Sequence, residues 1–165
     1  MEIRELHRAA FGPDHQPEVG GLVDALLRDP DALSVTETDD GVPVGNAIFT
    51  RSLLDAPPRL VDVQVLSPLA VLATHRRRGI GRSLIARGLR ILDERGVPLV
   101  FLEGDPAFYA KAGFLPAGPL GFRKPSLRIP DAGFQVIRLS AYEPWMTGTL
   151  VYAPAFWEHD AVGLR

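Results

Sequence analysis

Four arginines and two glycines lie within residues 76–82, in the middle of the chain. An apolar run precedes them, and apolar residues recur after them at the spacing of one helix face, so a strand, a glycine turn and a helix are expected in that order. The first N–H groups of a helix lack partners, and glycine lets an anion approach them closely. Such a turn predicts a pyrophosphate site, although a solvated basic helix start gives the same pattern. The residues expected to contact the anion are Arg76, Arg77, Arg78, Gly79, Ile80, Gly81 and Arg82.

The spacing of these residues excludes two common phosphate motifs. Leu84 occupies the place of the third glycine of a dinucleotide fingerprint, and no Gly-Lys-Ser/Thr sequence follows the glycines. The pattern that fits is Arg76-x-x-Gly79-x-Gly81. It resembles the Gln/Arg-x-x-Gly-x-Gly/Ala signature of the GNAT superfamily of N-acetyltransferases. That resemblance implies a site for the pyrophosphate of acetyl-CoA.

A second stretch, Phe108-Tyr-Ala-Lys-Ala-Gly-Phe114, follows about thirty residues later. It is similar to a GNAT element on the short helix after the fifth strand, and Gly-Asp-Pro before it resembles a bacterial branch of the superfamily. The resemblance covers residues 42–114 well and implies transfer of an acetyl group from acetyl-CoA to a primary amine of a small molecule or peptide. It places the Tyr109 hydroxyl beside the CoA sulfur. A phenol of pKa about 10 can protonate a departing thiolate, although Tyr109 could instead be a core aromatic.

The base that deprotonates the amine is less well defined by the sequence. Glu103, at the end of a short buried strand, is the candidate, with a solvated loop carboxylate as the alternative. Asp105 is better explained as the N-cap of the next helix, since Pro106 follows it. His75 is expected to face CoA or solvent, and Asp62 on the central strand is a weaker option.

Pro68 interrupts a long apolar strand expected from Leu60 to Ala73. Because proline cannot donate to a sheet ladder, the strand must lie at an edge or carry a bulge there. A disrupted strand leaves N–H groups that could stabilise an oxyanion. The resemblance places the pantetheine and acetyl contacts on Leu69, Ala70 and Val71.

The order of expected elements is helix, helix, hairpin, strand, helix, strand, helix, hairpin. Helices are expected over Ile3 to Phe11 and Val19 to Leu27, and the hairpin turns at 39–41 with its second strand ending at Thr50. This is an α/β arrangement, and the resemblance implies a mixed, mostly antiparallel twisted sheet flanked by helices in one domain over 1–165. GNAT chains usually open with a strand, which here is missing or lies upstream of Met1.

Composition limits the class of protein. Hydrophobic residues make up 46% and charged residues 23%, with a net charge of −2, so neither nucleic acid nor an anionic membrane is expected as a partner. There is no cysteine and no apolar run of about 20 residues, and the start at residues 1–8 is too charged for a secretory signal to be expected there. The expectation is a cytoplasmic acetyltransferase without a metal, with a homodimer left open as an alternative to a monomer. A catalytically idle acyl-CoA-binding module and an arginine-led nucleic-acid binder are the alternatives.

The stretch 117–133 is rich in glycine and proline and is expected to be a long loop. Its Arg123 and Lys124 suggest a lid that prefers an acceptor with an anionic group, although a plain surface loop fits equally well. Aromatic residues near the C-terminus could line the acceptor pocket or belong to the core. They are Trp145, Tyr152, Phe156 and Trp157.

Overall fold

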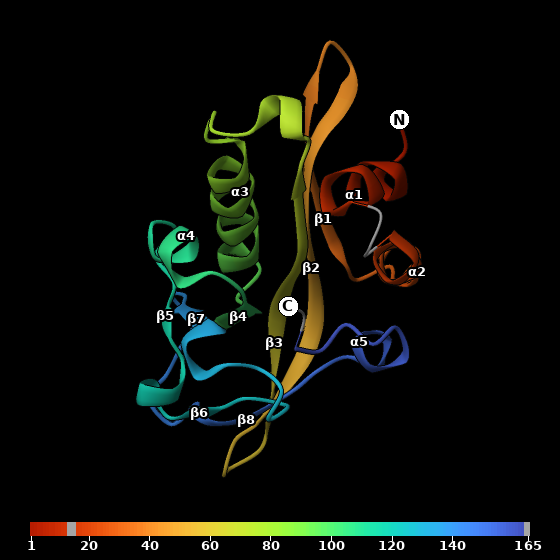
Figure 1. Ribbon diagram of the computed structural model, residues 1–165. Helices are drawn as coiled ribbons and strands as arrows, with labels where there is room; N and C mark the ends of the chain where they lie inside the picture. Colours follow the sequence, from red (N-terminus) through yellow and green to blue (C-terminus); the bar gives the residue numbers. More distant parts are fainter. Residues whose placement is uncertain (13–15, 164–165) are drawn as a thin grey trace.

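A single mixed sheet separates two layers of helices (Figure 1). The computed structural model describes residues 1–12 and 16–163. The helices are α1 (Ile3–Phe11), α2 (Gln16–Arg28), α3 (Ile80–Glu94), α4 (Pro106–Ala110) and α5 (Pro154–Glu158). The strands are β1 (Leu33–Asp39), β2 (Val42–Asp55), β3 (Leu60–Val71), β4 (Leu99–Glu103), β5 (Leu115–Pro116), β6 (Phe122–Arg123), β7 (Phe134–Arg138) and β8 (Gly148–Val151).

The strands follow the order β5-β7-β4-β3-β2-β8-β6, and β1 also pairs with β2. Among the strand pairs of residues 1–12 and 16–163, only β3–β4 and β6–β8 are parallel. The expectation of a mixed, mostly antiparallel sheet is therefore confirmed. Within the described ranges, no helix is long and apolar enough to cross a bilayer.

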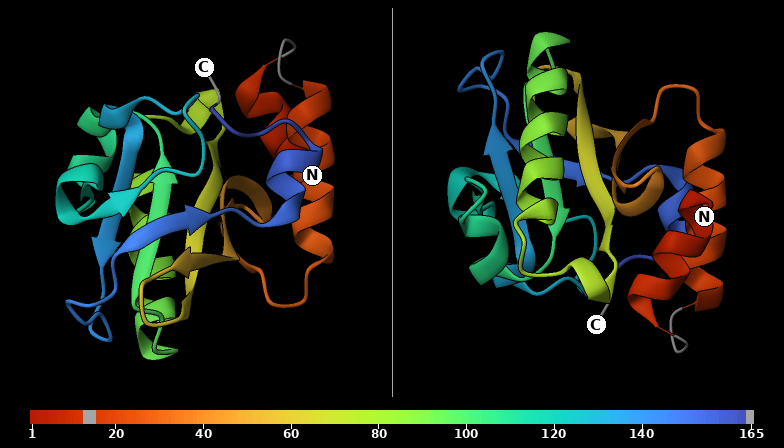
Figure 2. Two further views of the ribbon diagram at one scale, coloured as in Figure 1. Left: turned by 90° about the horizontal axis from the view of Figure 1, so that it is seen from below. Right: turned by 90° about the horizontal axis from the view of Figure 1, so that it is seen from above.

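Helices cover both faces of the sheet (Figure 2), and the buried apolar residues form two separate clusters. On one face, α3 buries Leu84, Ile85 and Leu92 completely or nearly so. On the other, α1, α2 and α5 pack over the sheet, with Leu22 and Leu26 of α2 buried there. The apolar spacing of each helix is what gives it one buried face.

The hairpin turns where the sequence predicted it, but its second strand is longer. Asp40 and Gly41 both have positive φ, 49° and 76°, as a two-residue turn of this kind requires. The predicted end of β2 at Thr50 is wrong, because the strand continues to Asp55. The polar residue Ser52 hides this continuation in the sequence. It is nevertheless buried, and its Oγ accepts a hydrogen bond from the Ala153 N–H at 3.2 Å.

Pro68 marks a bulge in a central strand, so the edge alternative does not apply. Phe49 of β2 faces Leu66 and Ala47 faces Leu69, so β3 carries one extra residue between these pairs. On its other side, β3 pairs with β4 only at Gln64 and Val65. Beyond that point the two strands diverge, and a gap opens between them.

The stretch 117–133 is more ordered than a loop without structure. It contains two 3-10 turns, Gly118–Leu120 and Asp131–Gly133, and strand β6, which pairs with β8. These short elements could not be recognised in the sequence, because the glycines and prolines leave no regular spacing of apolar residues. Ala117 and Ile129 are fully buried, which anchors the stretch to the core.

Candidate functional site

Two cavities adjoin each other, and each is lined by residues from the helices on both faces of the sheet. The first, the turn cavity, has a volume of about 590 Å³ and lies at the start of α3. The second, the strand cavity, has about 460 Å³ and lies where β3 and β4 diverge. Phe11 and Leu69 line both, so the two cavities form one continuous cleft. Most residues predicted to bind the cofactor line the turn cavity: Leu69, Ala70, Val71, Arg76, Arg77, Gly79, Ile80, Gly81 and Arg82.

The glycine turn has the geometry of an anion cradle. Gly79 caps α3 with φ 78° and ψ 10°, a left-handed conformation that favours glycine. It has no side chain to cover the N–H groups of the first helical turn, which lack partners within the helix. A Cβ on Gly79 would meet nothing within 4 Å, so the space beside its backbone is open. Gly81 instead packs under the ring of Phe108, 3.2 Å from an added Cβ.

The arginines of the turn have different roles. The Arg76 guanidinium donates to the Ala10 carbonyl at 2.9 Å and to the Val71 carbonyl at 3.2 Å, so it joins α1 to β3. Arg77 and Arg82 line the turn cavity, whereas Arg78 is exposed and lines neither cavity. A further cation was missed by the sequence reasoning. Lys111, the C-cap residue directly after α4, lines the same cavity.

His75 lines the turn cavity and does not line the strand cavity. Its Nε2 lies 2.8 Å from Oδ2 of Asp39 at the tip of the β1–β2 hairpin. Its Nδ1 lies 2.8 Å from the Thr74 hydroxyl. Both ring nitrogens thus contact protein groups.

The register of β3 shows which of its N–H groups face the gap. The Leu72 N–H donates to the Val44 carbonyl of β2 at 2.9 Å. Successive residues of an antiparallel strand point their N–H groups to opposite sides. The N–H groups of Leu69 and Val71 therefore point away from β2. On that side β4 has already diverged. These two N–H groups therefore face the cleft.

Glu103 lies at the bottom of the strand cavity and is held by the C-terminal part of the chain. Its Oε2 accepts a hydrogen bond from the Tyr152 hydroxyl at 2.7 Å, and its Oε1 accepts one from the Gly163 N–H at 2.8 Å. Burial, and then the adjacent Glu103 carboxylate, raise the pKa of Tyr152, so its hydroxyl remains a donor. The position of the Glu103 carboxylate is thereby fixed.

Tyr109 lies on α4 and lines the same cavity. Its ring packs edge-on against Phe108 and Phe114, and it lies so close to Gly104 that a Cβ there would approach the ring to 2.5 Å. Burial and the charge of Asp105 raise the pKa of Tyr109 to about 12. The phenol is therefore protonated at neutral pH.

Other residues singled out in the sequence fall in different places. Asp105 caps α4 as predicted, accepting from the Ala107 N–H at 2.9 Å, and it also lines the strand cavity. Asp62 is exposed and pairs with Arg51 at 2.6 Å, so it lines neither cavity. Of the C-terminal aromatics, Tyr152 and Phe156 line the strand cavity, whereas Trp145 and Trp157 do not.

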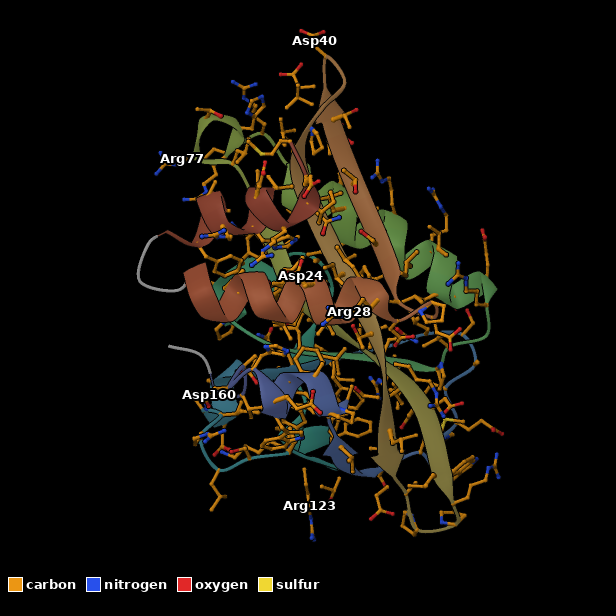
Figure 3. All side chains as sticks on the ribbon, turned by 90° about the vertical axis from the view of Figure 1, so that its right-hand side faces the viewer. Asp24, Arg28, Asp40, Arg77, Arg123 and Asp160 are labelled. Carbon is orange, nitrogen blue, oxygen red and sulfur yellow. The ribbon has the colours of Figure 1, made fainter. Side chains whose placement is uncertain are left out.

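The proposed basic lid does not match the structure. Arg123 and Lys124 line a separate cavity, and the Arg123 side chain points away from the body of the molecule (Figure 3). The Lys124 ammonium donates to the Ile129 carbonyl at 2.6 Å and pairs with Asp131 at 2.7 Å. Only Pro130 and Gly133 of the stretch line the strand cavity.

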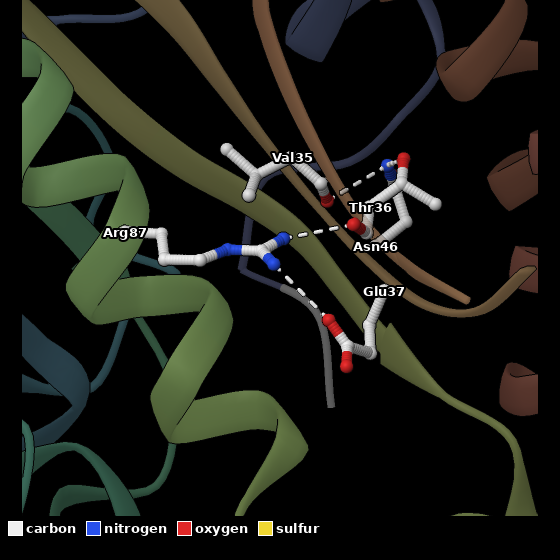
Figure 4. Close-up of polar contacts among 5 residues, drawn as sticks. All are labelled: Val35, Thr36, Glu37, Asn46 and Arg87. Carbon is white, nitrogen blue, oxygen red and sulfur yellow. Dashed lines mark hydrogen bonds and ion pairs between the residues drawn. The ribbon is translucent and has the colours of Figure 1, made fainter. Parts of the chain in front are cut away.

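Buried polar contacts fix the elements around the cleft. His7 of α1 is fully buried and donates from Nε2 to Asn46 Oδ1 at 2.8 Å, which holds α1, and with it Phe11, against β2. The Asn46 amide in turn donates to the Val35 carbonyl of β1 at 3.1 Å (Figure 4). On the other face, Arg87 ties α3 to β1 through Glu37 at 3.0 Å and the Thr36 carbonyl at 2.8 Å (Figure 4).

Residues 1–117 match the family model of the acetyltransferase (GNAT) domain. The chain belongs to the GNAT family of acetyltransferases. The N-acetyltransferase YjhQ of Escherichia coli K12 is 34% identical over 128 residues, which are 75% of this chain and 69% of YjhQ. As a GNAT acetyltransferase, the chain also resembles solved members of the family.

Two of those structures contain the coenzyme. The N-acetyltransferase YhbS of Escherichia coli in complex with CoA superposes with a TM-score of 0.81 at 30% identity, covering 93% of this chain and 84% of that chain. A GNAT acetyltransferase of Brucella melitensis in complex with acetyl-CoA gives a TM-score of 0.71 at 31% identity, covering 94% and 90%. The resemblance seen in the sequence is thus confirmed at the level of family and fold.

Proposed function

We propose that this GNAT acetyltransferase moves an acetyl group from acetyl-CoA to a primary amine of a small molecule or peptide. The observation that carries the proposal is the meeting of the two cavities at Leu69, beside N–H groups that face the cleft. The turn cavity would hold the coenzyme and the strand cavity the amine. Similar proteins whose structures contain CoA and acetyl-CoA support the assignment of the coenzyme.

The residues of the turn fit a pyrophosphate. The open space beside Gly79 admits a phosphate to the first N–H groups of α3, and Arg82 and Lys111 add positive charge from two elements. Arg77, held at φ 64°, contributes a third cation at the rim. The Arg76 guanidinium, which binds backbone carbonyls, would shape the cradle and leave the phosphates to its neighbours.

Acetyl-CoA supplies the acetyl group as a thioester, whose transfer to an amine leaves a thiol. The N–H groups of Leu69 and Val71 would stabilise negative charge on the carbonyl oxygen, since they already point into the cleft and need no reorganisation. Ala70 packs into the sheet between them and is buried. These roles rest on the direction of the backbone groups.

Two side chains of the strand cavity would handle protons. Glu103 would accept a proton from the substrate ammonium at a carboxylate oxygen, directly or through water. Tyr109 would donate a hydrogen bond from its hydroxyl to the developing thiolate. Full proton transfer from a phenol of pKa about 12 to a thiolate of ordinary basicity would be uphill by roughly three to four pKa units. Tyr109 therefore acts mainly by hydrogen bonding.

The experiment is a thiol-release assay across a panel of amines, combined with calorimetric titration of acetyl-CoA. The chain has no cysteine, so a thiol reagent reports only released CoA. Acetyl-CoA binding together with release that requires an amine supports the proposal. Tight binding with no release for any amine would contradict it and favour a binding module without catalysis.

A further inference from the structure

The strand cavity has a distinctive charge pattern. Two carboxylates line it, Glu103 and Asp105, and the remaining described lining residues include no lysine, arginine or histidine. Resting on the function proposed above, we propose that the acceptor is an amine with an aromatic or aliphatic body and no acid group. Amino acids and other substrates with a carboxylate or phosphate beside the amine are excluded by charge.

The two carboxylates occupy different depths. Glu103 is part-buried, with both oxygens bonded to the C-terminal part of the chain, so its position does not adjust to a substrate. Asp105 is exposed at the rim, where its Oδ1 caps α4. An ammonium entering the cavity passes one negative group and approaches another. An acid group following the amine would be placed against both, which disfavours its binding.

Most of the rest of the wall is apolar. Aromatic and aliphatic side chains approach from α1, from β3, from the residue after β8 and from α5. They include Phe11, Leu66, Leu69, Tyr152 and Phe156. A cavity of about 460 Å³ with such walls and a few polar groups is of the size that small organic ligands occupy. The body of the amine would therefore be uncharged.

The three cations of the segment 117–133 do not line the strand cavity: Arg123, Lys124 and Arg128. Lys124 is bonded to Asp131 and the Ile129 carbonyl, and Arg123 points away from the molecule (Figure 3). The preference for an anionic acceptor that the sequence suggested is thereby reversed.

Three matched amines test the proposal. Phenethylamine has an apolar body, phenylalanine adds a carboxylate to it, and phenylalaninamide adds a neutral group of the same size. We expect kcat/KM to be lower for phenylalanine than for phenethylamine by about 30-fold or more, with phenylalaninamide close to phenethylamine. Equal kcat/KM for phenylalanine and phenethylamine would overturn the proposal, and equally low values for the acid and the amide would assign the effect to size.

The variant Asp105→Asn removes the charge at the rim and keeps a residue that caps helices well. This substitution should reduce the ratio of kcat/KM for phenethylamine to kcat/KM for phenylalanine by about threefold or more, as expected for loss of one partly screened charge. The control Asp131→Asn removes an exposed carboxylate that lines a different cavity and should leave the ratio unchanged. A ratio that does not respond to Asp105→Asn counts against the charge mechanism.

Binding separates failure of this inference from failure of the proposed function. NMR titration of CoA-saturated enzyme gives the Kd of each amine without turnover. If phenethylamine binds more tightly than phenylalanine but neither is acetylated, the acceptor class stands and the transfer reaction is refuted for these amines. If neither binds, or phenylalanine binds as well, the acceptor class is wrong.

Discussion

The Tyr152 hydroxyl donates a hydrogen bond of 2.7 Å to Oε2 of Glu103, across 49 residues of sequence. Because burial raises the pKa of Tyr152, this donor stays protonated over the working range of pH. The contact couples the last strand of the sheet to the candidate base. It therefore gives a direct way to test whether the position of Glu103 matters.

The substitution Tyr152→Phe removes this hydroxyl and keeps the ring that packs against Phe156. We expect the KM of the amine to rise and kcat to fall, together about 5- to 50-fold in kcat/KM, because one charge-assisted hydrogen bond is lost. The Kd of acetyl-CoA should not change. Tyr142→Phe, on a residue that lines neither cavity, is the matched control. Equal effects of the two substitutions would assign Tyr152 to packing alone.

Tyr109→Phe tests the donor beside the leaving group. Loss of the hydroxyl should lower kcat by about 10- to 150-fold, because one hydrogen bond to a charged thiolate contributes about 1.5–3 kcal/mol. The affinity for acetyl-CoA should be retained, since the ring still packs against Phe108 and Phe114. Single-turnover kinetics measure the chemical step, and an unchanged rate would return Tyr109 to a purely structural role.

The raised pKa of Tyr109 also has a consequence for stability. In the unfolded chain the phenol ionises near pH 10, whereas in the folded protein it stays neutral up to about pH 12. Between these values the unfolded state holds fewer protons than the folded state, so stability falls as pH rises. We expect Tyr109→Phe to lose less stability than the wild type over this window, by at most about 3 kcal/mol. Urea denaturation at pH 9 and pH 11 measures how far the free energy of unfolding falls in each protein. An equal fall in the wild type and in Tyr109→Phe would contradict the prediction.

The buried His7 gives the opposite dependence on pH. Burial lowers its pKa below 6.5, partly offset by the bond to Asn46. Below that pH the unfolded chain takes up a proton that the folded chain refuses, so stability is present above pH 6.5 and is lost as pH falls. In His7→Gln, the free energy of unfolding should therefore fall less steeply with decreasing pH, by up to about 1.4 kcal/mol per pH unit. Urea midpoints at pH 7.5 and 5.5 test it, and an identical acid slope in the variant would refute it.

Gly79 and Gly96 lie just before and just after α3 and form a matched pair. Both have positive φ, 78° and 80°, and neither has a neighbour within 4 Å of an added Cβ. Alanine at either should cost about 1–2 kcal/mol of stability through left-handed strain. Only Gly79→Ala places its Cβ beside the turn cavity, so only it should weaken acetyl-CoA binding, by tenfold or more. Calorimetric titration measures the Kd of acetyl-CoA for each variant. Equal Kd values for Gly79→Ala and Gly96→Ala would exclude a phosphate at this turn.

The parts of the site that are local in sequence could be predicted. The turn before α3 and the cap of α4 each depend on residues within one helical turn, so their types and spacing indicate the structure. The bulge at Pro68 was one of two expected solutions, because the absence of a proline N–H restricts what a strand can do there. Family resemblance then joined these pieces in the right order.

The contacts that complete the cleft could not be predicted, because they join distant segments. Nothing in the sequence indicates that the Gly163 N–H reaches Glu103, 60 residues away, or that Phe11 lines both cavities. These contacts depend on how α1 and the segment after α5 pack against the sheet. The full length of β2 was missed for a related reason, since the buried Ser52 gains its partner only in the folded chain.

Arg76 is the residue for which motif and geometry disagree, and it provides the last prediction. The motif places it at the pyrophosphate, yet its guanidinium bonds the Ala10 and Val71 carbonyls and so fixes α1 against the end of β3. Arg82 lines the turn cavity, and none of the hydrogen bonds or ion pairs resolved among the described residues engages its guanidinium. The two arginines should therefore respond differently to lysine, which keeps the charge but lacks the planar fork.

We expect Arg82→Ala to weaken acetyl-CoA binding by about 3- to 10-fold, an effect that salt reduces, with stability unchanged. Arg82→Lys should restore most of this binding. Arg76→Ala and Arg76→Lys should behave alike, each lowering the free energy of unfolding by about 1 kcal/mol and weakening binding of both substrates, because the shared wall at Phe11 shifts. The exposed Arg90, farther along α3, is the control for loss of a surface cation. Recovery of acetyl-CoA affinity in Arg76→Lys would show that Arg76 acts on the phosphates through its charge, against the geometry of its guanidinium.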